Sequence, residues 1–192
     1  MNYTKAKPVG IDKPIQLLQT FLYSKVSTLF NLDDSNYNQY GRIYRNTDGT
    51  NGYQPQAFIG GIEYNPLLLN DKVVMHSFFD IGETITANTD LSYKYKANVS
   101  LYVFCNVAKL ETLVTGNAPI TRYDEEVRTA FMNLLDGKYD FRIQSVDVGA
   151  KKALSEYTGK DKTADIARAQ QPYHIFKINM VLPNYDTKFN NC

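Results

Sequence analysis

The segment KANVSLYVFCNV, residues 96–107, alternates between two kinds of side chain along its whole length. One set of alternate positions is apolar throughout: Ala97, Val99, Leu101, Val103, Cys105 and Val107. Because successive side chains of a strand point to opposite faces, this pattern predicts a β-strand with one face in the core. The other set begins with polar residues but reaches Tyr102 and Phe104. We therefore expect the second half of this strand to be covered on both faces.

Two amphipathic helices are predicted on either side of this strand. The first spans about residues 13–30, with Asp12 as its N-cap, Pro14 in its first turn and a recurrent apolar face at Ile15, Leu18, Leu22, Val26 and Leu29. The second begins near Thr121, which has capping-box spacing to Asp124, and stops at Gly137. Its apolar face is formed by Val127, Ala130, Phe131 and Leu134.

Further strands are expected at residues 41–45, 73–81 and 139–149, and in the closing run 172–183. The fold class is α+β, with an antiparallel or mixed sheet packed against two main helices and with long loops. A chain of 192 residues suits one domain, residues 1–192. Within it we expect an extended N-terminal arm (1–11), an inserted helical or mobile segment (149–171) and a C-terminal tail (184–192).

The stretch RNTDGTNGYQPQAFIGGIEYNP, residues 45–66, contains four glycines and two prolines. It lacks the residue order of a phosphate-binding loop, and its Gly60-Gly61 pair does not open a helix. Its glycines are better explained as turn residues. We interpret the stretch as a long connection, with a short strand in its second half.

Composition narrows the classes of partner and of chemistry. Lys and Arg number 21 against 20 Asp and Glu, so the basic excess of a dedicated nucleic-acid binder is missing. Fifteen tyrosines favour extensive protein contacts. The two cysteines, Cys105 and Cys192, do not indicate a disulfide framework or a metal site. Neither a secretion signal nor a membrane span is predicted.

Residues that could act as a catalytic acid, base or nucleophile do not form a recognisable motif in the sequence. The two histidines, His76 and His174, each lie inside an apolar strand run and are interpreted as structural. The carboxylate clusters 33–34 and 124–126 fall where turns and helix N-termini use acids. We therefore expect no catalytic residue, no metal and no cofactor, and a protein that is not an enzyme.

The order of elements resembles the small α+β fold of tail terminators and other neck ring proteins of tailed phages. Three segments are most similar to ring proteins of the crAss-like phages: residues 7–46, DEEVRTAFMNLLDG at 124–137 and FKINMVLPNY at 176–185. The inserted segment 149–171 departs from the compact tail-terminator pattern and leaves the level of the ring in the neck open.

This resemblance implies a structural virion protein, made in the host cytoplasm, that forms a homo-oligomeric ring between head and tail. Twelve copies are preferred over six. The implied partners are copies of itself, adjacent portal, neck and tail ring proteins, and the double-stranded genome passing through the lumen without sequence specificity. Residues 45–66 would then be a contact loop. Candidate subunit or channel contacts are Arg42, Arg45, Asp48, Tyr53, Lys151 and Lys152.

Two other functions stay open at this point. The chain is alternatively a soluble binding module that recognises a glycan or a host protein through an exposed, tyrosine-rich β face. An enzyme without recognisable motifs ranks last, because no group of acid, base and nucleophile can be named.

Overall fold

The computed structural model describes residues 1–47, 53–59, 64–67, 72–87, 94–117, 122–157 and 172–186. Its centre is a six-stranded mixed sheet with the strand order β1-β2-β6-β7-β9-β8. The strands are β1 (Asn2–Tyr3), β2 (Tyr37–Arg42), β6 (Met75–Ala87), β7 (Lys94–Asn106), β8 (Arg142–Val148) and β9 (Tyr173–Asp186). The pairs β1–β2 and β2–β6 are parallel and the other pairs are antiparallel. The α+β class is confirmed.

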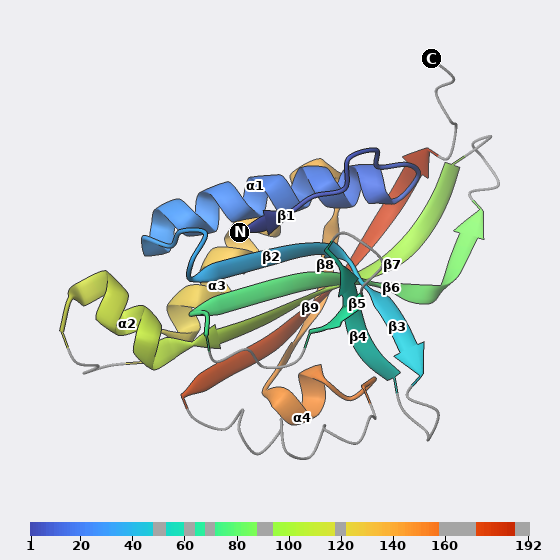
Figure 1. The fold of residues 1–192 in the computed structure, drawn as a ribbon. Helices are drawn as coiled ribbons and strands as arrows, with labels where there is room; N and C mark the ends of the chain where they lie inside the picture. Colours follow the sequence, from blue (N-terminus) through green and yellow to red (C-terminus); the bar gives the residue numbers. More distant parts are fainter. Residues whose placement is uncertain are drawn as a thin grey trace.

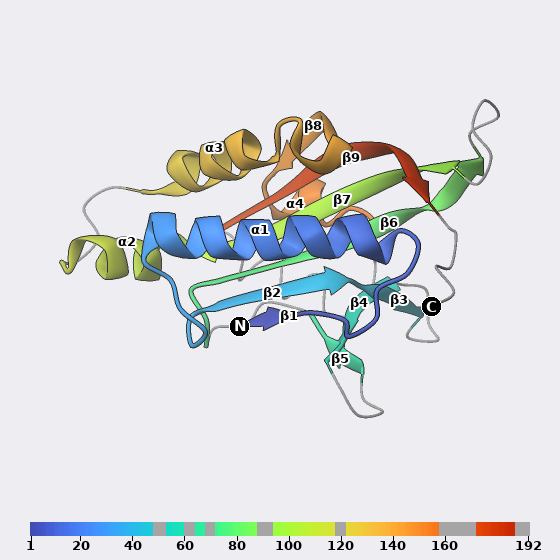
Figure 2. The ribbon, with the colours of Figure 1, turned by 90° about the horizontal axis from the view of Figure 1, so that it is seen from above.

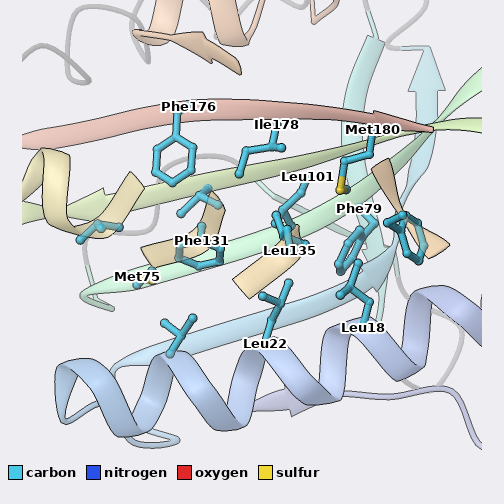
Figure 3. Packing of buried hydrophobic residues seen from close by; sticks show 14 of the residues in the cluster. Leu18, Leu22, Met75, Phe79, Leu101, Phe131, Leu135, Phe176, Ile178 and Met180 are labelled. Atoms are coloured by element: carbon cyan, nitrogen blue, oxygen red, sulfur yellow. The ribbon is translucent and has the colours of Figure 1, made fainter. Parts of the chain in front are cut away.

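Helices cover one face of this sheet (Figures 1 and 2). They are α1 (Asp12–Phe30), α2 (Val107–Thr115) and α3 (Asp124–Leu135), and the short 3₁₀ helix η1 (Lys138–Asp140) follows α3. Figure 3 shows Leu18 and Leu22 of α1 and Phe131 and Leu135 of α3 pointing toward Met75, Phe79, Leu101, Phe176, Ile178 and Met180 of the sheet. This cluster includes residues from Ile11 to Tyr185, so α1, α2 and α3 share one core with the central strands of the large sheet.

A second layer covers part of the opposite face. It consists of a three-stranded antiparallel sheet, β3 (Tyr44–Thr47), β4 (Tyr53–Phe58) and β5 (Tyr64–Pro66), and of the short helix α4 (Ala150–Ala153). Phe78, Tyr102 and Phe104 of the large sheet pack beneath it. The aromatic end of β7 is therefore covered on both faces, as its sequence predicts.

Several sequence-based boundaries need correction. The first long strand begins at Tyr37, before the predicted start at residue 41, because it pairs in parallel with β6. Strand β6 continues past Ile81 to Ala87, with an irregular register between Ile81 and Ile85. Helix α3 begins at Asp124 with Tyr123 at its N-cap, without a side-chain cap. Thr121, the predicted cap, lies outside the described residues.

The described parts of the stretch 45–66 are almost entirely β-structure and form most of the small sheet. The first part of the predicted inserted segment is also ordered by packing. Ala153, Leu154 and Tyr157 are buried against the large sheet, because they complete the second cluster of apolar side chains. The rest of that segment, residues 158–171, and most of the tail, 187–192, lie outside the described residues.

Candidate assembly surface

The small sheet carries aromatic side chains on its outer face. Gln56 and Phe58 are two residues apart on β4 and therefore point to the same face. Their cross-strand partners, Tyr44 for Gln56 and Tyr64 for Phe58, lie on that face as well. The Tyr64 ring lies 5.2 Å from the Tyr44 ring and 5.4 Å from the Phe58 ring, between centroids. With Ile59 these residues are 38–49% exposed. We call Tyr44, Phe58, Ile59 and Tyr64 the aromatic patch.

A hollow of about 530 Å³ adjoins the aromatic patch and shares three of its residues. Its other walls come from residues 3–7, from α1 and from the end of β2. Lys5, Lys7 and Arg42 supply three cations to this wall, and Asp12 supplies one carboxylate. We call this feature the basic hollow. It combines apolar walls with an excess of positive charge, which suits an occupant that is partly apolar and acidic.

Asp12 holds two of the cations of the basic hollow. Lys5 Nζ lies 2.7 Å from Asp12 Oδ2, and Arg42 Nε lies 2.7 Å from Asp12 Oδ1. Burial raises the pKa of the Asp12 carboxyl, but hydrogen bonds from Lys5 and Arg42 outweigh it, so the net pKa is below its usual value. The predicted N-cap role is wrong. Ile11 occupies that position and the Asp12 carboxylate pairs with the cations instead.

Residues 1–11 do not extend away from the molecule in their first part. Asn2 and Tyr3 pair with Gln39 and Tyr40 of β2, and the Tyr3 and Tyr40 rings stack at 4.7 Å. The buried side chain of Gln19 donates hydrogen bonds to Asn2 Oδ1 and to the Tyr3 carbonyl, both at 2.8 Å. The arm is therefore a wall of the basic hollow.

An internal ionic network fastens the small sheet to the large one. Arg45, on the inner face of β3, donates from Nη2 to Asp80 Oδ2 at 2.8 Å and to Glu156 Oε2 at 2.8 Å. The Tyr157 hydroxyl donates to Asp80 Oδ2 at 2.9 Å. Lys177 Nζ donates to Glu156 Oε1 at 2.7 Å. Burial raises the pKa of Glu156. The hydrogen bond from Lys177 and the charges of Lys177 and Arg45 together lower it by more, so the net pKa is below its usual value.

The structure disperses the six predicted contact residues. Arg42 lies at the basic hollow, with its guanidinium 5.4 Å from the centre of the Tyr44 ring. Arg45 faces inward, so its charge is neutralised within the chain. Tyr53 is exposed at the start of β4, and Asp48 lies outside the described residues. Exposed Lys151 and Lys152 lie at α4, where Lys152 Nζ is 2.9 Å from Asp147 Oδ1.

Sequence reasoning missed Phe58, Ile59 and Tyr64 as a group with Tyr44. The separations along the chain do not show that Tyr44, Phe58 and Tyr64 share a face, because the registers of β3 with β4 and of β4 with β5 decide it. The available signal was the clustering of aromatic residues within an otherwise polar, glycine-rich stretch.

The two histidines and Cys105 are buried, and Cys105 pairs directly with His174 between β7 and β9. His76 is stacked on Phe104, and burial lowers the pKa of its imidazole to about 3. Burial also lowers the pKa of His174 and raises the pKa of the Cys105 thiol. Among the described residues, no three His, Cys, Asp or Glu side chains are placed to hold a metal ion. Within the same ranges, no helix has the length and apolar character to span a bilayer.

Comparisons with protein-family models, with curated proteins and with solved structures found no match to this chain.

Proposed function

We propose that this chain is a structural protein that works by self-association, as a subunit of a homo-oligomeric ring in the head-to-tail neck of a tailed phage. The observation that carries the proposal is the aromatic patch. Three aromatic side chains, Tyr44, Phe58 and Tyr64, lie together on the outer face of a sheet that is itself fastened to the core, and the exposed Ile59 directly follows Phe58. Apolar side chains that cluster on a surface are typical of an interaction site, whereas single exposed ones are not.

The internal network supports this proposal because it holds the small sheet in one orientation. Arg45 and Asp80 are separated by 35 residues, and Arg45 and Glu156 by 111. A contact surface on a fixed platform loses less conformational freedom when it binds than one on a loose loop. The copy number of twelve, the neck location and the passage of genomic DNA follow from the resemblance and are parts of the same proposal.

Sedimentation velocity over a rising concentration series tests self-association. The wild-type chain is expected to form a discrete closed oligomer that negative-stain microscopy shows as a ring. The double substitution Phe58→Ser/Tyr64→Ser should keep the fold, since both side chains are exposed, but should shift the chain toward monomer. Ile85→Ser is the matched control, because Ile85 is similarly exposed but lies on β6, outside the aromatic patch. A wild-type chain that stays monomeric throughout, even with a cross-linker, refutes the proposal.

A second candidate is a soluble binding module for a glycan or a host protein. The specific observation in its favour is that the aromatic patch borders the basic hollow, since aromatic faces beside polar groups suit sugar rings as well as proteins. Titration with immobilised glycans separates the two functions. A monomer that retains glycans, and that loses them on Phe58→Ser/Tyr64→Ser, would favour the binding module.

A further inference from the structure

The turn between α3 and β8 has an unusual backbone. Gly137, Tyr139 and Asp140 have φ values of 64°, 50° and 66°. Positive φ is costly for a tyrosine and persists only where the surroundings hold it. Asp136, Tyr139 and Asp140 are exposed, whereas Lys138 lies over the rings of Phe21 and Tyr139. We call residues 136–140 the acidic turn. Its exposed side chains are one aromatic ring and two carboxylates, and the half-buried Lys138 leaves it with a net negative charge.

The acidic turn and the basic hollow lie on opposite flanks of α1. Tyr139 packs edge-on against Phe21, with ring centroids 6.1 Å apart. Asp12, Gln16 and Gln19 line the basic hollow from the other side of the same helix. In Figure 2, α3 and the chain that follows it lie on one side of α1, and β1 and β2 lie on the other. A neighbouring copy placed beside the molecule would bring one of these surfaces to the other.

The two surfaces match in chemistry. The basic hollow has apolar walls with the cations Lys5 and Lys7 at its exposed end. The acidic turn offers the partly exposed Tyr139 ring with Asp136 and Asp140 beside it. Opposite charges around an apolar contact guide the encounter of two surfaces and disfavour wrong pairings. The matching is between different surfaces of one chain, which is the arrangement that closes into a ring by rotation.

We infer that the basic hollow receives the acidic turn of a second copy of this chain, with Tyr139 against its apolar wall and Asp136 facing Lys7. This inference rests on the proposed function and adds to it the pair of surfaces that meet. It also makes the contact directional, because each copy gives its acidic turn to one neighbour and its basic hollow to the other.

A charge exchange tests the inference. Lys7→Glu and Asp136→Lys change exposed residues for which the structure shows no ion pair among its described part, so both variants should fold. Each alone is expected to weaken association by about tenfold, equivalent to about 1.4 kcal/mol. The double variant Lys7→Glu/Asp136→Lys should recover most of the loss, because opposite charges face each other again. Lys96→Glu is the control and should leave association unchanged, because Lys96 is exposed and belongs to neither surface.

Cross-linking identifies the contact directly. In a Cys192→Ser background, Lys7→Cys/Asp136→Cys with a short bismaleimide should give a ladder of covalent oligomers, whose highest rung reports the copy number. Replacing Asp136→Cys by Lys96→Cys should give no ladder. Failure of the ladder, or a charge exchange without recovery, overturns the inference. Wild-type association that persists in those experiments, and that Phe58→Ser/Tyr64→Ser abolishes, leaves the proposed function standing, whereas a monomeric wild type overturns that function.

Discussion

Replacing Arg45 by methionine removes the cation from a carboxylate that is almost completely buried. The Asp80 side chain is 4% exposed, and Arg45 approaches it with Nε at 3.0 and 3.2 Å from its two oxygens and with Nη2 at 2.8 Å. The hydroxyl of Tyr157 remains as a donor at 2.9 Å, but it carries no charge to balance the carboxylate. The variant therefore contains a buried anion without its main counter-ion.

The size of the effect follows from this burial. Breaking a buried ion pair by removing one partner costs about 3–5 kcal/mol. The Arg45 side chain keeps 20% exposure, so water screens part of the interaction and the lower end applies, about 3 kcal/mol. For a chain of this length that corresponds to a fall in Tm of about 6–12 °C. Since the chain has no tryptophan, urea unfolding followed by far-ultraviolet circular dichroism is the suitable measurement.

Two matched variants isolate the cause. Arg42→Met breaks the pair with Asp12, in which the arginine side chain is 34% exposed, and should cost only about 1 kcal/mol. Arg45→Met/Asp80→Asn removes both charges and should recover part of the loss, because no buried anion is left. If Arg45→Met unfolds within 1 kcal/mol of the wild type, the network does not anchor the small sheet.

Three further predictions concern the core and the arm. Burial lowers the pKa of His76 from 6.5 to about 3, so between these two pH values only the unfolded chain binds a proton at this imidazole. Stability should therefore fall as the pH drops through this window, by up to about 1.4 kcal/mol per pH unit. His76→Met should reduce the slope of unfolding free energy against pH in this window by the equivalent of about one proton. Urea unfolding at successive pH values measures this slope. Gly41→Ala should destabilise by about 1–2 kcal/mol, since its Cβ would stand 2.9 Å from Oε1 of the buried Gln19, whereas Gly82→Ala, with a nearest contact of 3.4 Å, should cost less. In a Cys192→Ser background, Cys105 should react with thiol reagents only at the rate of unfolding, because it is fully buried and burial raises its pKa; labelling of this native variant within minutes would contradict the prediction.

Local periodicity was sufficient to place the main elements. The apolar repeat Ile15, Leu18, Leu22 and Val26 predicts α1, and all four side chains are buried in the structure. The alternation of residues 97–107 predicts β7 and its core face. The change to Tyr102 and Phe104 also anticipates a second covering layer. These predictions succeed because a helix or strand displays its buried face at a fixed spacing along the chain.

The pairing of strands was less accessible to sequence reasoning. Tyr37 to Arg42 looks like turn and loop in isolation, yet it forms β2 because β6 and β1 supply its backbone partners. The small sheet contains Gly- and Pro-rich connections that resemble a long loop. Its strands are stabilised by each other and by the large sheet, which are contacts that no short window of sequence reports.

The sequence by itself determined the helical and strand faces, the α+β class and the spread of tyrosines over the chain. Only the tertiary structure decided which charges are free. Asp12 pairs with Arg42 at a separation of 30 residues, and Arg45 pairs with Glu156 at a separation of 111. The sequence shows that a residue is arginine, but not whether its side chain faces solvent or a buried carboxylate. The charged groups available for assembly are therefore those that are not paired within the fold. Which groups these are depends on the arrangement of the whole chain.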